Sequence, residues 1–393
     1  MNREPIDPER AAVPEAADPP SNPHPEIESI PEPASLLPQQ GDPLWIILGP
    51  HGLRAGWSIL LFAVLLTLFA YIFGTVISSI VAGVFHIKLA GETASSSIAS
   101  EGAWVMALAA TMAILARIER RRFVDYYLAG PAVGARFVSG LVSGFAALSV
   151  LVAVMAWGGW IHFGSAPQYH AQLLRYAALW AVAFLLVALT EEGTFRCYLQ
   201  FTLARGINFW GALAAVGSMC LWDLAHSTSH GTGGVYAMAA LGVFPCLYLH
   251  MRKTPRSGFW QAAWVSSTVF GFIHTGNNGE TWIGIFAASA IGFVFCVSVR
   301  LTGSAWWAIG CHAAWDWAET YFYGTADSGF AAPGHLLNTT PAGSALWSGG
   351  TDGPEGSILV LPIILLLLLA LLAMYGRNRQ PRATAELAES VAG

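Results

Sequence analysis

The feature of this sequence that most limits its fold is a succession of apolar blocks, most of them near the 20 or so residues that a helix needs to cross a bilayer. Backbone polar groups find no water inside a bilayer, so such blocks are expected to fold as helices. We therefore predict an all-α, polytopic transmembrane helix bundle with about 8 to 10 spanning helices. The candidate helices lie at about 56–85, 102–117, 136–161, 171–204, 208–226, 232–250, 258–275, 281–300, 304–322 and 356–376.

The composition agrees with this interpretation and excludes other classes. Hydrophobic residues make up 55% of the chain and charged residues only 11%, whereas soluble domains carry about 25% charged residues. The net charge of −5 comes largely from the amino-terminal tail, and no long basic run is present. A nucleic-acid partner is therefore not expected.

The two ends of the chain differ from its apolar middle. Residues 1–44 are rich in proline and acidic residues, which predicts a disordered tail, and they show no cleavable secretory signal. We divide the rest into amino-terminal transmembrane helices (45–135), a core (136–330), an external loop (331–355), a last transmembrane helix (356–376) and a second tail (377–393).

Basic residues indicate the orientation, because Lys and Arg in short loops stay on the cytoplasmic side. They fall at alternate helix ends, so both termini are predicted to be cytoplasmic, in a multi-pass protein of the cell membrane. The connection from about Gly324 to Gly356 has no Lys or Arg and is rich in Gly, Pro and Ser. It is expected to be external, where it could cover a site from outside.

The first chemical motif is Thr190-Glu191-Glu192-Gly193-Thr194-Phe195-Arg196. An ionisable side chain inside a membrane is costly and is a functional candidate by default. Glu192 and Arg196 share a helical face, so an ion pair between them would leave Glu191 free to point into the bundle as a general base. The structural alternative is an ion pair at an interfacial helix end.

Two further motifs contain histidine. His274 lies near the end of an apolar block and begins His-Thr-Gly-Asn-Asn. His312 and Asp316 lie four residues apart, on one face of another apolar helix. Two polar groups turned the same way in a span point to a site, a wet cavity or a structural hydrogen-bond network.

Other polar residues are given structural roles. Asp223, His226 and His230 have a spacing seen on metal-binding helices, but the Ser, Thr and Gly residues around them favour solvated interface residues over ligands. The five cysteines show no paired spacing and are predicted to be small buried hydrophobes: Cys197, Cys220, Cys246, Cys296 and Cys311.

Together, the double glutamate with Arg196, the Phe270-x-x-x-His274 pattern and the final His312-x-x-x-Asp316 resemble the three motifs of the CPBP family. That family comprises type II CAAX prenyl proteases and bacteriocin-processing enzymes, intramembrane proteases often described as abortive-infection proteins. The similarity spans about residues 136–330. It implies that Glu191 is the catalytic glutamate, that Glu192 and Arg196 support it, and that His274 and His312 with Asp316 supply the second and third motifs.

The resemblance also leaves choices open. Family members are described both as metalloproteases and as glutamate-dependent proteases; we favour a water activated by Glu191 and His274, with His312 stabilising the oxyanion. Position 316 is Asp where the prenyl proteases have Asn, and an ionised Asp cannot donate a hydrogen bond to an oxyanion. Asp316 is therefore protonated, or it orients His312, or it belongs to a zinc site. The possible zinc ligands are Glu191, His274, His312 and Asp316.

Two features of the sequence bear on the second histidine. The interval between Glu191 and His274 contains an extra helix pair at 208–250, so His226 is a second candidate for the histidine of the second motif. His226 lacks the His-Thr-Gly-Asn-Asn continuation that resembles the family. The predicted topology also places Glu191 in the cytoplasmic half of its helix and His274 near the external end of another.

Three functions are compatible with these residues. The first is cleavage of a membrane-embedded peptide or protein, with an unprenylated substrate favoured over a prenylated one. The second is a non-catalytic membrane scaffold in which the motif residues form a hydrogen-bonded core. The third, which the motif order disfavours, is a proton-coupled transporter.

Overall fold

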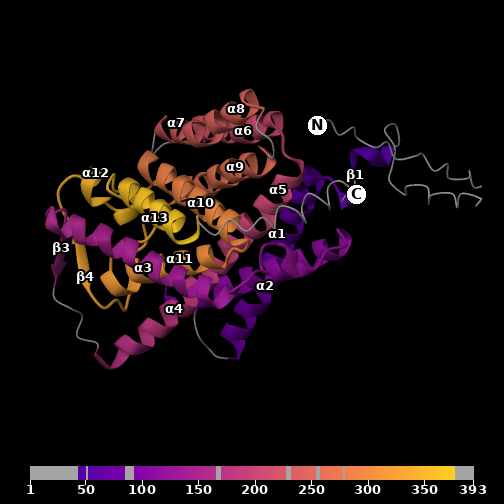
Figure 1. Cartoon of the computed structure of the whole chain (residues 1–393). Coiled ribbons are helices and arrows are strands. Elements are labelled where there is room, and N and C mark those ends of the chain that lie inside the picture. The colour runs from indigo at the N-terminus through magenta and orange to yellow at the C-terminus, as the bar shows by residue number, and fades with distance from the viewer. Residues whose placement is uncertain are drawn as a thin grey trace, which may run out of the picture.

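A computed structural model describes residues 43–49, 52–84, 93–164, 170–226, 232–253, 257–277 and 279–376 of the 393-residue chain. Both predicted tails lie almost wholly outside these residues. All ten apolar blocks are helical, and the all-α prediction is confirmed (Figure 1). The helices are α1 (Ala55–Gly83), α2 (Ala94–Ile118), α3 (Val133–Trp157), α4 (His170–Glu192), η3 (Gly193–Leu199), α5 (Gln200–Gly206), α6 (Phe209–His226), α7 (Gly233–Met238), η4 (Ala239–Val243), α8 (Phe244–Met251), α9 (Ser257–Ile273), α10 (Trp282–Thr302), α11 (Trp306–Trp317), η6 (Ala318–Tyr323) and α13 (Val360–Tyr375).

Within the described residues, six helical stretches are long and apolar enough to cross a membrane. They are 55–83, 94–118, 133–157, 172–206, 233–251 and 282–302, and the apolar α13 is shorter. The chain is therefore a multi-pass membrane protein. How many of the remaining helices also cross the bilayer completely stays a prediction.

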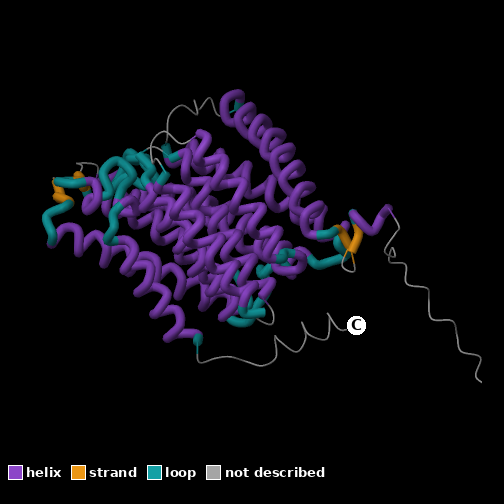
Figure 2. The backbone as a smooth tube through the Cα atoms, turned by 90° about the horizontal axis from the view of Figure 1, so that it is seen from above, coloured by secondary structure: helices purple, strands orange, loops and turns teal. Residues whose placement is uncertain are grey.

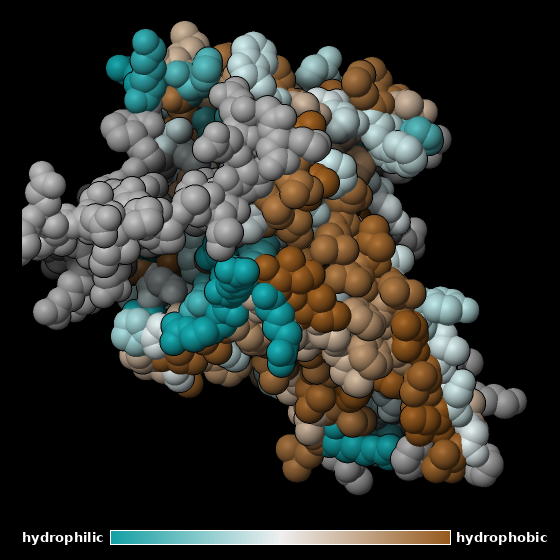
Figure 3. All heavy atoms as spheres, turned by 90° about the vertical axis from the view of Figure 1, so that its right-hand side faces the viewer, coloured by the Kyte–Doolittle hydropathy of each residue, from teal (hydrophilic) through white to brown (hydrophobic). Residues whose placement is uncertain are grey.

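The outer surface suits a lipid environment. Only 6% of the apolar window of α1 is buried within the protein, and it exposes large side chains such as Leu60, Val64 and Leu68. Figure 3 shows a broad hydrophobic surface on one face of the molecule. Exposed apolar area of this extent is expected where lipid rather than water covers the protein.

Helix α2 begins earlier than the apolar pattern predicted. The segment predicted at 102–117 starts at Ala94, because Thr93 and Ser96 form a capping box that satisfies the first backbone N–H groups. The correction brings Glu101 into a membrane-length helix of 25 residues.

The predicted long helix at 171–204 is present, with one irregularity in its middle. The α4 helix passes into a π-helical turn, η3, directly after Glu192, and continues as α5. Such π turns recur at functional sites, because they rotate the side chains that follow relative to those before.

Close helix contacts hold α11 in the bundle. A Cβ atom added to Gly140 or Gly144 of α3 would lie 2.2 or 2.0 Å from a carbonyl oxygen of α11, and one added to Gly310 would lie 2.3 Å from a carbonyl oxygen of α3. Backbones approach this closely in membranes where small residues form the interface. Figure 2 shows the helices packed side by side in one bundle.

The extra helix pair at 208–250 forms an outer layer. Helices α6 and α8 pack on α9 through a cluster that includes Phe209, Val216, Cys246 and Val265, and they lie at the top of Figure 1. The pair therefore leaves α9 in contact with α5 and α10. The insertion lengthens the chain between the Glu191 and His274 motifs without separating the two motifs in space.

Short strands complete the fold. The helix predicted to reach residue 161 ends at Trp157, and Ile161–Gly164 (β3) pairs antiparallel with Asn338–Pro341 (β4). A second small antiparallel pair joins β1 (Leu48–Gly49) to β2 (Gly52–Leu53). The β3–β4 pairing fixes part of the predicted external loop, which also contains a short helix, α12 (Ala345–Ser348).

Four of the five cysteines are buried as predicted, and Cys220 is half-buried. All five are free thiols.

Candidate active site

A cavity of about 280 Å³ lies between α2, α4, α9, α10, α11 and the connection that leads to α13. It is lined on one side by apolar residues of α10 and α13, and elsewhere by a dense set of ionisable groups. Among the described residues the lining includes no Lys or Arg. The ionisable groups that line it are His274, His312, Glu101, Glu191, Glu280, Asp316, Asp327, Asp352 and Glu355.

Glu192 and Arg196 form the buried ion pair that their spacing predicted. Arg196 Nη1 lies 3.1 Å from Glu192 Oε1, and both side chains are fully buried. The guanidinium also lies 4.2 Å from the centre of the Phe270 ring, a cation–π contact. The helix continues through η3 into α5, so the ion pair does not lie at a helix end, although a buried structural ion pair is present as the alternative predicted.

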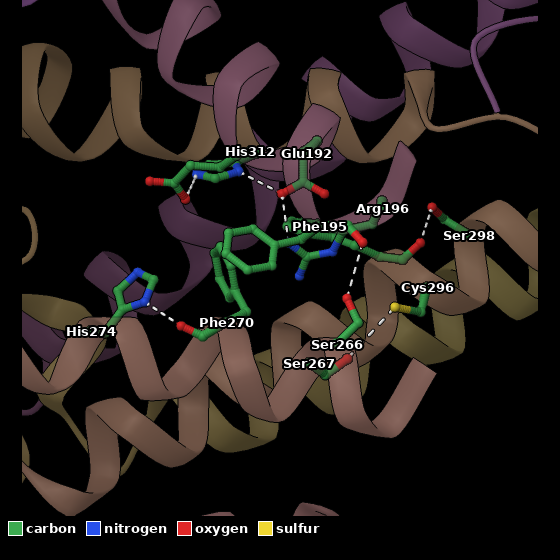
Figure 4. Close-up of polar contacts among 12 residues, drawn as sticks. Glu192, Phe195, Arg196, Ser266, Ser267, Phe270, His274, Cys296, Ser298 and His312 are labelled. Carbon is green, nitrogen blue, oxygen red and sulfur yellow. Dashed lines mark hydrogen bonds and ion pairs between the residues drawn. The ribbon is translucent and has the colours of Figure 1, made fainter. Parts of the chain in front are cut away.

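His312 joins this pair to the cavity. Its Nδ1 lies 2.9 Å from Glu192 Oε1, so the ring donates to that carboxylate, as Figure 4 shows. The opposite nitrogen, Nε2, lies 3.3 Å from Asp316 Oδ2 and 3.7 Å from Glu191 Oε2. Both ring nitrogens therefore face carboxylates, an arrangement that favours the doubly protonated imidazolium.

Glu191 differs from Glu192 in its access to the cavity. The Glu191 side chain is 28% exposed, whereas Glu192 is sealed from the surface. The adjacent glutamates thus occupy different environments. Glu191 can meet a substrate or a water, and Glu192 holds Arg196 and His312.

The hydrogen bond of His274 fixes its tautomer. Its Nδ1 lies 2.7 Å from the Phe270 carbonyl oxygen, which can only accept (Figure 4). The proton is therefore on Nδ1, and in the neutral ring Nε2 is an acceptor. Because His274 lines the cavity, it offers a basic nitrogen to a molecule bound there.

The structure resolves the difference in depth that the sequence suggested between Glu191 and His274. Helices α5 and α9 run antiparallel, since Gly258 packs against Ala204 and Ser266 donates to the Phe195 carbonyl oxygen over 3.0 Å. At 1.5 Å per residue, Glu191 lies about 20 Å from Ala204, and His274 about 24 Å from Gly258. The two side chains therefore reach one level of the bundle.

The family comparison matches the same part of the chain. The model described as "Type II CAAX prenyl endopeptidase Rce1-like" matches residues 173–255 and 246–318, a stretch that contains Glu191, His274 and His312. The two matches together run from residue 173 to residue 318, less than half of the 393-residue chain, so the chain is similar to this family over that part. The Rce1-like family is a protease family, so the match supports a CAAX-type protease at family level. No curated protein and no solved structure matches the chain.

His226 lies away from the cavity lining. It is exposed, stacks on Trp222 and bonds to the Trp222 carbonyl oxygen over 3.0 Å. His230 falls outside the described residues. The cavity thus includes the favoured second histidine, His274, and not its rival.

The four possible zinc ligands share the cavity without forming a compact ligand set. Among the described residues, no three of Glu191, His274, His312 and Asp316 bring their ligand atoms within 4.8 Å of one another. His312 already has a carboxylate at each ring nitrogen. The arrangement does not fit a tetrahedral zinc site as it stands, so no step below is assigned to a metal.

Several acidic residues of the cavity were not predicted from the sequence. Glu101 preceded the predicted start of its helix, and Glu280, Asp327, Asp352 and Glu355 were interpreted as loop residues. Burial and the neighbouring Asp352 raise the pKa of Glu280 to about 9. Burial and Asp327 raise the pKa of Asp352 to about 7. For Asp327, Asp352 and Glu355, the signal that could have found them is a connection with acidic but no basic residues.

Proposed function

We propose that this chain is an intramembrane endopeptidase that hydrolyses a peptide bond of a membrane-associated peptide or protein, using a water activated by Glu191 and His274. The observation that supports this most is the different surroundings of the two adjacent glutamates: Glu191 faces the cavity that His274 and His312 also line, whereas Glu192 is sealed against Arg196. A general base must reach its water, and only Glu191 of the two can do so.

In this mechanism Glu191 takes a proton from the water while Nε2 of His274 accepts its second hydrogen bond. The water oxygen forms a bond to the scissile carbonyl carbon, and the carbonyl π electrons move to its oxygen. The positive charge of imidazolium His312, whose two N–H groups face Glu192 and Asp316, stabilises that oxyanion. Glu191 then gives its proton to the amide nitrogen, the C–N bond breaks, and a carboxylic acid and an amine leave.

Glu192, Arg196 and Asp316 are positioning residues in this scheme. Glu192 and Asp316 hold the His312 ring, because Nδ1 lies 2.9 Å from Glu192 Oε1 and Nε2 lies 3.3 Å from Asp316 Oδ2. Asp316 need not donate to the oxyanion, because it acts through His312. The Asp found here in place of Asn then favours the charged ring, since an Asp carboxylate offsets its positive charge.

The distribution of Arg and Lys supports two further proposals about location. We propose that the chain lies in the cell membrane with both termini in the cytoplasm. Arg205 Nη1 lies 2.8 Å from Glu119 at the end of α2, near the start of α1, so basic helix ends from separate parts of the chain lie at one end of the bundle. The acidic connection from 324 to 359 contributes to the cavity lining.

The test uses the purified full chain in proteoliposomes with two probes, an unprenylated single-span peptide and a farnesylated CAAX peptide. Mass spectrometry identifies new termini. We expect cleavage of the unprenylated probe by the natural protein, loss of cleavage in His274→Ala, and retained cleavage in the matched control His226→Ala. Intact probes with the natural protein, or equal cleavage by the two variants, would contradict the proposal.

The scaffold alternative is distinguished by the same variants. The buried network of Glu192, Arg196 and His312 is also what a stabilising core would contain. If the motif residues serve only stability, their removal lowers the unfolding temperature, and the natural protein leaves both probes intact.

A further inference from the structure

A second group of carboxylates borders the same cavity. Glu319 lies in η6, Asp327 follows in the connection, and Glu355 belongs to the 3-10 turn η7 (Pro354–Gly356) that precedes α13. One ligand oxygen from each lies within 4.8 Å of the other two. Asp327 and Glu355 also line the cavity.

No Lys or Arg among the described residues forms an ion pair with these carboxylates, two of which, Asp327 and Glu355, are half-buried and interact with the charge of His312. Glu319 is fully buried; its Oε2 accepts from Trp315 Nε1 over 3.0 Å, but its Oε1 has no hydrogen-bond partner. Nearby Asp352 is 1% exposed, and its Oδ2 also has no partner. Residues 324–359 contain no Lys or Arg. Unpaired buried charge costs several kcal/mol, so such oxygens point to a bound cation.

The surrounding backbone positions the carboxylates. Gly353 has a φ of 108°, and an added Cβ would lie 2.2 Å from the Ala326 carbonyl oxygen and 3.3 Å from Glu319 Oε1. Only glycine allows the chain to pass this close. Thr320 Oγ1 donates to Asp327 Oδ2 over 2.9 Å, which orients that carboxylate.

We propose that Glu319, Asp327 and Glu355 bind a hard divalent cation, with Ca²⁺ preferred over Mg²⁺. All three donors are oxygen, the ligand type that both ions require. Ca²⁺–oxygen distances of about 2.3–2.6 Å place opposite ligands about 5 Å apart, so these oxygens need little rearrangement, whereas Mg²⁺ at about 2.1 Å needs a tighter set. The bound ion ties the connection and the start of α13 to the end of α11, at the rim of the cavity.

The proposed cation site shares the cavity with the proposed catalytic residues, but it does not depend on proteolysis and is tested by binding. The full chain, purified in detergent and stripped with chelator, is titrated with CaCl₂ and with MgCl₂ by calorimetry, and its unfolding temperature is followed. We expect one Ca²⁺ site, weaker Mg²⁺ binding, and a higher unfolding temperature with Ca²⁺. Glu355→Gln and Asp327→Asn should each weaken Ca²⁺ binding about tenfold or more, because affinity follows the charge of the ligands.

Two control variants show whether Ca²⁺ binds at these carboxylates rather than elsewhere on the protein. Asp125→Asn removes a carboxylate paired with Arg122 on an exposed turn and should leave Ca²⁺ affinity unchanged. Glu191→Gln should also bind Ca²⁺ normally, so a failed protease proposal leaves this result intact. A folded natural protein that binds neither ion at millimolar concentration, or a Glu355→Gln variant with unchanged affinity, would overturn the proposal.

Discussion

Gly144→Ala is predicted to damage the site by displacing α11. The added Cβ would lie 2.0 Å from the Cys311 carbonyl oxygen, about 1.4 Å closer than the 3.4 Å at which ordinary contacts begin. Relief requires α3 and α11 to separate by about that amount, directly beside His312. Overpacking of this kind costs about 1–3 kcal/mol, and a displacement of about 1 Å at a catalytic group lowers activity about 100-fold.

The matched control is Gly134→Ala on the same helix, where an added Cβ meets nothing within 4 Å. Gly134 is the second residue of α3 and an added methyl group has room there, so this variant should be about as stable as the natural protein. Thermal unfolding in detergent and the cleavage rate of the proteoliposome probe are measured for both. Equal stability and equal rates in the two variants would refute the packing argument.

Two other predictions follow from the ionisable groups. Arg196→Met should lower the free energy of unfolding by about 3 kcal/mol, because Glu192 is left buried beside His312 alone. The double variant Arg196→Met with Glu192→Gln should recover part of that loss. An unchanged midpoint of chemical denaturation in Arg196→Met would argue against a stabilising ion pair. The pKa of Glu280 is raised from 4.5 to about 9, so the folded state holds this proton more tightly than the unfolded state. In the presence of chelator, the free energy of unfolding should therefore fall as the pH rises from 4.5 to about 9. Glu280→Gln should flatten that fall, and an identical pH profile for the variant would contradict the assignment.

The sequence predicted the helices and the motif contacts that depend on local geometry. Apolar block length located all ten helices, and the four-residue spacing predicted that Glu192 meets Arg196 and that Asp316 meets His312. These contacts lie within one helix, so the helical repeat alone determines them.

Features that depend on contacts between distant segments were not predictable in this way. That Glu191 and His274 share a level follows from where α9 packs on α5, which no local pattern encodes. The roles of Glu319 and Glu355 depend on a connection that folds back over the cavity. An acidic loop is normally expected to be solvated, and only its return to the bundle brings Glu355 beside the buried Glu319.

The central claim is that Glu191 activates the water, and single-turnover cleavage by Glu191→Gln tests it most directly. This change keeps the size of a partly exposed side chain, so the unfolding temperature should remain that of the natural protein. The cleavage rate should fall at least about 100-fold, because the amide cannot accept the proton of the water. A folded Glu191→Gln variant that cleaves the probe at a rate within about tenfold of the natural protein would contradict the claim.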